Sequence, residues 1–315
     1  MEPTTTLARS ALHTELAHGL ADWGAGERDA LIPLVDAELR GFPDEALARC
    51  AARIRQTEHD WGFHPADPVA RVLSRLGYRL VMDGSELLGL PNLAVAHGRP
   101  VFFVANHLSF GDANVVDQLL VSFGQRDIAD KLTVLVGPKV YASPTRRLAS
   151  MCFGAIKIPQ SQSRASGEAV MPRREVARLA VETLACVARR HAAGDHVLIF
   201  VEGTRSRTGA MQRVLAASAR YFEGDDALVV PIGLWETEKL VPLASERVFA
   251  HPVRARVGAP VSAAELAARV GGRRPVIADA LGYLIAALLP PEYRGVYGEV
   301  GPFEPAHAAA ASFSA

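Results

Sequence analysis

The sequence predicts an α/β protein, in which a mixed, largely parallel sheet is flanked by helices and preceded by a small N-terminal helical bundle. Two observations lead to this prediction. Up to about residue 80 apolar residues recur at helical spacing, whereas from about residue 90 short apolar runs alternate with helical periods. Such alternation is typical of parallel strands covered by helices. We therefore expect a helical bundle over 1–80, an α/β domain over 81–305 and a disordered, alanine-rich tail over 306–315.

The bundle is expected from amphipathic stretches that glycine and proline separate. Leucines recur at near-helical spacing in the first stretch, as they do on one face of a helix. The breaks between the stretches contain glycine or proline, which commonly end helices. Short stretches of this kind predict helices that pack on one another. They cover residues 7–20, 31–39, 47–54 and 69–76.

The α/β part is expected from apolar runs of strand length with amphipathic helices between them. Loops at the strand ends of such sheets commonly bind ligands, and two polar motifs fall at such ends. The expected strands cover residues 101–105, 132–136, 154–158, 197–201, 228–232 and 253–257, and the expected helices cover 113–123, 144–153, 173–193 and 276–289.

The composition limits the class of protein. Of the 315 residues, 49% are hydrophobic and 22% are charged, which is typical of a globular chain. Lys plus Arg and Asp plus Glu number 34 each, so the formal net charge is zero. Nucleic-acid binding usually requires a basic excess and is not expected. Any anion that the protein binds must therefore be met by locally placed charges.

The cysteines and the N-terminus predict the compartment. Cys50, Cys152 and Cys186 lack metal-ligand spacing, and we expect free thiols in a reducing compartment. The N-terminus has no apolar core between basic residues, and no apolar run reaches the roughly 18 residues that span a bilayer. We expect a cytoplasmic protein, with transient contact at a membrane surface left open.

The first polar motif contains a histidine with a nearby carboxylate. His107 follows an apolar strand, and Asp112 comes five residues later, where a helix is expected to begin. An imidazole oriented by a carboxylate is suited to take a proton from a hydroxyl as a general base. As alternatives, His107 is an ordinary loop residue and Asp112 only caps the helix. The second motif favours the catalytic interpretation.

The second motif, over residues 202–207, contains two arginines beside a glycine turn. Arg205 and Arg207 can reach one phosphate from the same loop, because each planar guanidinium donates two parallel hydrogen bonds. The alternative is a solvated basic turn in which Glu202 pairs with one of the arginines.

Together the two motifs resemble those of the glycerolipid acyltransferases, which include glycerol-3-phosphate and lysophosphatidate acyltransferases. Asn106, His107 and Asp112 match the first motif of that family, N-H-x4-D. Residues 200–207 match its third motif, F-x-E-G-T/x-R-S-R, and the apolar segment 229–232, with its Pro-Ile ending, looks like the fourth. The resemblance extends over about residues 95–260. The helical N-terminal segment makes the chain look most similar to the soluble, plastid-type glycerol-3-phosphate acyltransferases.

The resemblance implies direct transfer of a fatty acyl group from a thioester, on acyl carrier protein or coenzyme A, to a hydroxyl of glycerol 3-phosphate or a related phosphorylated acceptor. His107 would be the general base and Asp112 would orient it, without an acyl-enzyme, a metal or a further cofactor. Ser109, two residues from His107, has no role as a nucleophile in such a mechanism. The implied acceptor site, a site for a small anion, comprises Glu202, Gly203, Thr204, Arg205 and Arg207, with Lys157 as a further candidate.

The second family motif is where this chain departs from the pattern. The family commonly has G-x-x-F-I-x-R, whereas the corresponding segment here ends in Gln160. Gln162 and Ser163 fall near the place of a Lys-His pair in the plastid-type enzymes. Lys157 or Arg164 could replace the missing cation, although strand alternation leaves the direction of Lys157 open.

This departure keeps other functions open. One alternative is the same chemistry on the amine or hydroxyl of an amino lipid, a sugar or a specialised metabolite. Another is a non-catalytic homologue that binds lipid or carrier protein, which the intact His107–Asp112 pair disfavours. A metal hydrolase that uses this pair lacks a convincing further set of ligands.

Overall fold

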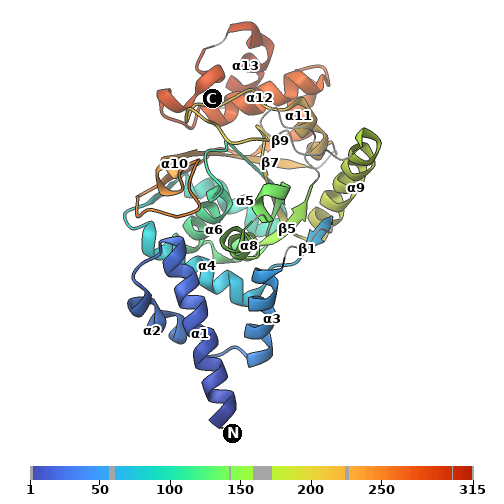
Figure 1. The fold of residues 1–315 in the computed structure, drawn as a ribbon. Coiled ribbons are helices and arrows are strands. Elements are labelled where there is room, and N and C mark those ends of the chain that lie inside the picture. The colour runs from blue at the N-terminus through green and yellow to red at the C-terminus, as the bar shows by residue number, and fades with distance from the viewer. Residues whose placement is uncertain are drawn as a thin grey trace.

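The computed structural model describes residues 3–56, 61–141, 143–158, 172–223, 227–299 and 301–313. Within these residues the centre of the protein is a nine-stranded sheet (Figure 1). Its strands are β1 (Gly62–His64), β2 (Glu86–Leu88), β3 (Phe102–Ala105), β4 (Leu132–Val136), β5 (Gly154–Lys157), β6 (His196–Phe200), β7 (Leu228–Trp235), β8 (Arg254–Val257) and β9 (Val261–Ser262).

The sheet is mixed and largely parallel, as predicted. The strand order is β1-β5-β4-β6-β3-β7-β8-β2, and β9 pairs with β7. The five neighbouring strands from β5 to β7 are parallel to one another. β1 and β8 run antiparallel to their neighbours in that set. β3 therefore lies between β6 and β7, and this position determines which loops meet at its end.

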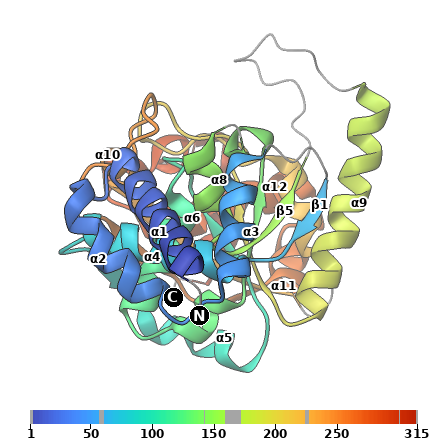
Figure 2. The same cartoon turned by 60° about the horizontal axis from the view of Figure 1, so that its bottom comes forward.

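The helices cover both faces of the sheet (Figures 1 and 2). β3 illustrates why its sequence is apolar at every position. Phe103 and Ala105 belong to one hydrophobic core, whereas Phe102 and Val104 belong to the other. Since side chains alternate along a strand, a central parallel strand must be apolar on both faces. The helices are α1 (Pro3–Trp23), α2 (Arg28–Leu39), α3 (Asp44–Arg55), α4 (Pro68–Val81), α5 (Ala94–Gly98), α6 (Asp112–Ser122), α7 (Arg126–Asp130), α8 (Pro144–Ser150), α9 (Arg173–Ala192), α10 (Thr237–Leu240), α11 (Ala263–Arg269), α12 (Arg274–Ala286) and α13 (Glu304–Ala311).

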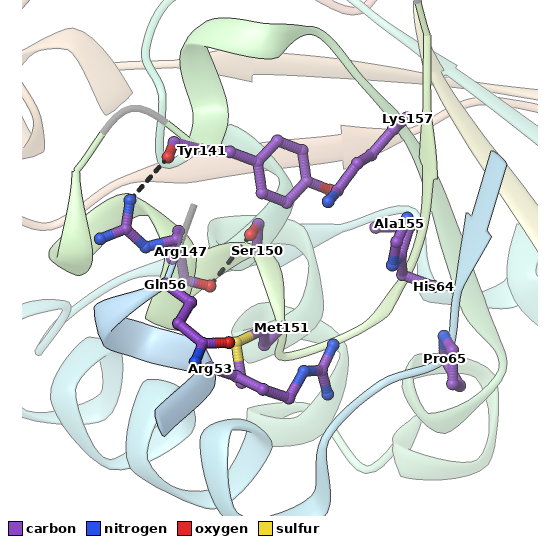
Figure 3. A pocket seen from close by; sticks show the side chains of 10 residues that line it. All are labelled: Arg53, Gln56, His64, Pro65, Tyr141, Arg147, Ser150, Met151, Ala155 and Lys157. Atoms are coloured by element: carbon purple, nitrogen blue, oxygen red, sulfur yellow. Dashed lines mark hydrogen bonds between the residues drawn. The ribbon is translucent and has the colours of Figure 1, made fainter. Parts of the chain in front are cut away.

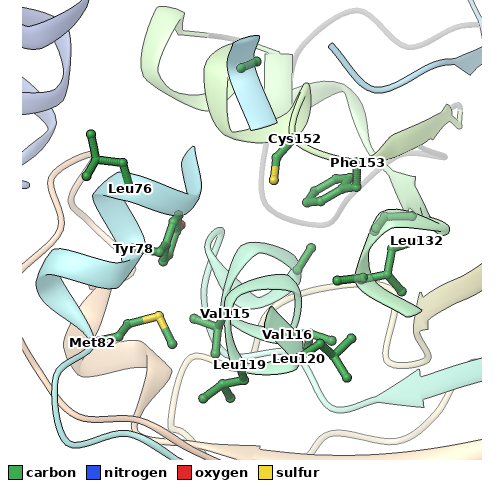
Figure 4. Close-up of a cluster of buried hydrophobic side chains, with 14 of the residues drawn as sticks. Leu76, Tyr78, Met82, Val115, Val116, Leu119, Leu120, Leu132, Cys152 and Phe153 are labelled. Atoms are coloured by element: carbon green, nitrogen blue, oxygen red, sulfur yellow. The ribbon is translucent and has the colours of Figure 1, made fainter. Parts of the chain in front are cut away.

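The N-terminal helices share their core with one face of the sheet. Leu20 of α1, Leu73 of α4 and Leu119 of α6 belong to the same buried cluster as Phe103. Figure 4 shows the part of this cluster in which side chains of α6 lie between Leu76 and Tyr78 of α4 on one side and Cys152 and Phe153 on the other. β1 also lies within the segment expected to be a bundle, and it pairs with β5 at the edge of the sheet. The helices expected before residue 80 are therefore present, and the boundary between two domains at that position stays a prediction.

The expectation of a disordered tail from residue 306 is wrong over the residues that α13 contains. Ala306, Ala309 and Ala310 are buried against the C-terminal layer of helices, which includes α12. Alanine has the highest intrinsic helix propensity, and its small side chain permits close packing. The alanine-rich segment is therefore a packed helix. None of the helices in the described ranges is long and apolar enough to cross a membrane.

Candidate active site

The site lies where β3, β6 and β7 end. Ala105 at the end of β3 is level with Phe200 of β6 on one side and Ile232 of β7 on the other. Because the three strands are parallel, the segments that follow them leave the same edge of the sheet. The two polar motifs predicted from the sequence follow β3 and β6, and they meet here.

Asn106 fixes the chain directly after β3. Its side-chain amide donates to the carbonyl oxygen of Leu234 at 2.8 Å, and its side-chain oxygen accepts from the Leu234 N–H at 2.8 Å. Asn106 is fully buried. The amide thus continues the pairing of β3 with β7 after the backbone pairing has ended, and His107 leaves the sheet from a fixed point.

The loop after β6 fixes the backbone of His107 on both sides. The His107 N–H donates to Glu202 Oε1 at 2.8 Å, and the His107 carbonyl oxygen accepts from the Ser206 N–H at 2.7 Å. Glu202 Oε2 accepts from the N–H of Gln212 at 2.6 Å. Burial raises the pKa of Glu202 to about 7, although these two N–H donors act in the opposite direction. Glu202 is therefore a structural link between the two motifs.

The imidazole of His107 is oriented by a carboxylate and an aromatic ring. His107 Nδ1 lies 2.8 Å from Asp112 Oδ2, and the ring stacks on Phe200 with a centroid distance of 4.3 Å. Asp112 Oδ2 also accepts from the N–H groups of Leu108 at 2.6 Å and Ser109 at 3.0 Å. These donors precede Asp112, so its carboxylate closes the loop and does not cap α6.

Asp112 is fully buried, yet it is stabilised as a carboxylate. Burial alone would raise its pKa, but hydrogen bonds from His107, Ser109 and Thr237 outweigh that effect and lower the pKa below its ordinary value. Ser109 Oγ and Thr237 Oγ1 each donate to Oδ1 of Asp112 at 2.6 Å. The Ser109 hydroxyl is thus committed to Asp112. Thr237 was not predicted from the sequence, since it lies 125 residues from Asp112 in no recognised motif.

His107 opens onto a pocket of about 910 Å³, a size typical of sites for small organic ligands. Its lining divides into an apolar and a cationic part. The apolar residues include Trp23, Tyr78, Val134, Phe153 and Val241, and the charged residues are Lys139, Arg146, Arg205, Arg207, Glu202 and Glu246.

Two arginines stack on Phe110 in this pocket. The guanidinium carbon of Arg205 lies 3.4 Å from the ring centroid and that of Arg146 lies 3.8 Å from it. Burial, and then the charge of Arg146, lower the pKa of Arg205 to about 10. Arg146 also pairs with Glu246 at 3.1 Å. Arg146 belongs to α8. The sequence does not predict it as a site residue, because no motif marks it.

The remaining predicted residues of the arginine loop lie around the same pocket. Gly203, Thr204 and Arg207 are exposed and line it. Gly203 has a φ of 67°, and a Cβ there would lie 2.2 Å from Leu215 Cδ1. Glycine is therefore required for the turn and for the position of Leu215, which also lines the pocket.

Lys157 does not line the His107 pocket. It is buried, and its ammonium lies 4.2 Å from the ring centroid of Tyr141. Figure 3 shows it in a separate small cavity with Arg53 and Arg147. The alternation of β5 places its side chain there, so the structure does not bring Lys157 to the other predicted acceptor residues. Gln160, Gln162, Ser163 and Arg164 lie outside the described residues.

Fold and site together define an α/β protein in which a partly exposed histidine pairs with a buried carboxylate beside a large, partly cationic pocket. Residues 89–235, which contain this pair and the arginine loop, match the family described as Acyltransferase. This match confirms the resemblance to acyltransferases that the motifs of the chain indicate.

Among solved structures, the crystal structure of the 1-acyl-sn-glycerophosphate (LPA) acyltransferase PlsC from Thermotoga maritima is similar over 89% of this chain and 97% of that one. The sequence identity is 14% and the TM-score is 0.44. No curated protein matches the chain.

Proposed function

We propose that this protein transfers a fatty acyl group from a thioester of acyl carrier protein or coenzyme A to a hydroxyl of glycerol 3-phosphate or a related phosphorylated acceptor. One observation supports this most strongly. The oriented imidazole of His107 shares a pocket with the stacked guanidinium groups of Arg205 and Arg146. A base for a hydroxyl and cations for an anion therefore lie in one cavity.

The proposed reaction uses His107 Nε2. Because Nδ1 faces the Asp112 carboxylate, Nδ1 carries the proton and Nε2 is the basic nitrogen. As the acceptor oxygen attacks the thioester carbonyl, Nε2 takes the hydroxyl proton and Asp112 stabilises the imidazolium. The C–S bond then breaks, and the imidazolium returns the proton to the leaving thiolate. The acyl group passes directly to the acceptor oxygen.

The lining of the pocket supports a substrate with two different ends. The apolar part, which includes Trp23 and Phe153, is suited to a fatty acyl chain. The cationic part is suited to a phosphate, because guanidinium groups form charge-assisted hydrogen bonds with phosphate oxygens. We assign Arg205, Arg207 and Arg146 to the acceptor. Glu202 and Gly203 shape the loop that carries the first two of these residues.

The same chemistry on an amine or on a neutral hydroxyl is the second candidate. It is favoured by Gln160, which stands where the family commonly has a cation. The two candidates differ in the charge of the acceptor. The acceptor panel must therefore include glycerol 3-phosphate, lysophosphatidate, glycerol and an amino alcohol.

The test incubates the purified protein with acyl-coenzyme A or acyl carrier protein and each acceptor, with mass spectrometry of the products. His107→Ala should lower the rate roughly 100- to 10,000-fold, as expected for loss of a general base. His97→Ala is the matched control, because His97 also pairs with an aspartate, Asp127, at 2.7 Å, but on the surface. Transfer by His107→Ala at the wild-type rate, or by neither protein with any acceptor, would refute the proposal.

A further inference from the structure

Thr237 contacts the His107–Asp112 pair from a third segment of the chain. It is the first residue of α10, directly after the turn that follows β7, and it is fully buried. Its hydroxyl lies 2.6 Å from Asp112 Oδ1. We propose that Thr237 is a positioning residue, which holds the carboxylate of Asp112 in the plane that His107 requires. This inference rests on the proposed function for its kinetic consequence, but its structural consequence can be measured without a substrate.

The hydrogen bonds of Asp112 divide between its two oxygens. Oδ2 meets His107 and two backbone N–H groups, whereas Oδ1 meets only the hydroxyls of Ser109 and Thr237 among the described residues. Ser109 belongs to the same loop as His107 and moves with it. Thr237 instead comes just after β7, the strand that pairs with β3. Its hydrogen bond therefore fixes the carboxylate of Asp112 relative to the sheet.

The backbone before Thr237 supports this assignment. Glu236 has a φ of 69° and is the one non-glycine residue with a positive φ in the described part of the chain. Such a conformation is unfavourable for a residue with a Cβ and persists only where its surroundings impose it. Here Glu236 pairs with Lys239 at 3.0 Å and with Arg254. These ion pairs hold the turn that directs the side chain of Thr237 back to Asp112.

Removal of the Thr237 hydroxyl should affect the pair in two ways. Oδ1 loses a donor in a fully buried place, so the carboxylate can rotate and the His107 ring is less well oriented. Loss of a donor also increases the proton affinity of the pair, so the acid limb of the rate profile should move to higher pH. The other ionisable groups that act on Asp112 are Glu202, Tyr78 and Arg205, and Thr237→Val leaves them in place.

The kinetic test compares Thr237→Val, Thr237→Ser and Thr183→Val. Thr183 is a buried threonine of α9 whose hydroxyl donates to a backbone carbonyl away from the site, so it controls for the loss of a buried hydroxyl. We expect Thr237→Val to lower kcat about 10-fold with little change in KM, the loss of roughly one hydrogen bond to a charged group. Thr237→Ser should restore most of kcat, and Thr183→Val should leave it unchanged.

A second measurement keeps the inference independent of activity. The ring nitrogen and Nδ1–H resonances of His107, assigned by their loss in His107→Ala, report its tautomer and hydrogen bond. These signals should shift or broaden in Thr237→Val and return in Thr237→Ser, with the unfolding transition of each variant showing that it is folded. A wild type without His107-dependent transfer would refute the proposed function alone. Unchanged His107 resonances in a folded Thr237→Val, or an unchanged kcat and pH profile in an active enzyme, would refute the positioning role.

Discussion

The most informative variant for the acceptor is Arg146→Ala. The Arg146 side chain is 19% exposed, and its guanidinium stacks on Phe110 opposite the cation of the predicted motif, Arg205. A hydrogen bond between charged groups contributes about 1.5–3 kcal/mol. Because Arg146 is partly exposed and already pairs with Glu246, we take the lower part of that range. At about 1.4 kcal/mol for each factor of ten, KM for a phosphorylated acceptor should rise roughly 10- to 30-fold.

The assay measures initial rates against acceptor concentration at saturating thioester. Arg146→Ala should leave the thioester KM unchanged and should not affect transfer to glycerol, which lacks a charge. Arg178→Ala, at an exposed arginine of α9 that also pairs with a glutamate, is the matched control. Glu246→Gln should act in the opposite direction and lower the acceptor KM, because Glu246 competes with the phosphate for Arg146. Equal losses with charged and neutral acceptors in Arg146→Ala would refute the assignment of Arg146 to the anion.

Two further variants test the acyl end of the pocket and the link between the motifs. Trp23→Ala should enlarge the apolar end and shift the preferred donor to a longer acyl chain, measured by competition between thioesters of different length; an unchanged preference would remove Trp23 from the chain-binding surface. For Glu202→Gln, the sign follows from the pKa of about 7, which lies above the ordinary value of 4.5: the wild type loses stability as pH rises from about 4.5 through 7. The variant does not titrate there, so its stability relative to the wild type should increase with pH by up to about 3 kcal/mol, and parallel pH profiles of denaturant unfolding would contradict this account.

The sequence predicts a strand where the pattern of its own residues is sufficient, without knowledge of the strands that pair with it. β3 and β4 are buried at every position, so an unbroken apolar run marks each of them. β1, β2 and β9 have only two or three residues each, too few for a periodic signal. α13 was misjudged for a related reason: its alanines indicate no amphipathic face, and only the surface of α12 makes them buried.

The residues of the candidate site also fall into two groups, those that the sequence predicts and those that only the three-dimensional packing brings to the site. His107, Asp112 and the loop 202–207 come soon after predicted strands. Their motifs therefore predict that they belong to one site. Thr237 comes just after β7 and Arg146 lies within α8, and no motif marks either residue. Their distance from His107 depends on the order of the strands and on the packing of α8. A single sequence does not specify that order, since it arises from long-range pairing. Lys157 shows the converse, because it lies at the end of a predicted strand, β5, but its side chain faces a different cavity.

The position of β3 between β6 and β7 also explains how His107 is held in place. The backbone of His107 is bonded to the loop after β6, through Glu202 and Ser206, and its carboxylate partner is bonded to the helix after β7, through Thr237. The imidazole is therefore located by both neighbours of its own strand. Since the three strands are themselves fixed by backbone pairing, little reorganisation remains when a proton is transferred, which is the condition for electrostatic stabilisation of the imidazolium. It follows that variants at Glu202 and Thr237 should slow the proposed reaction without touching the substrate, whereas variants at Arg146 should change which acceptor is used.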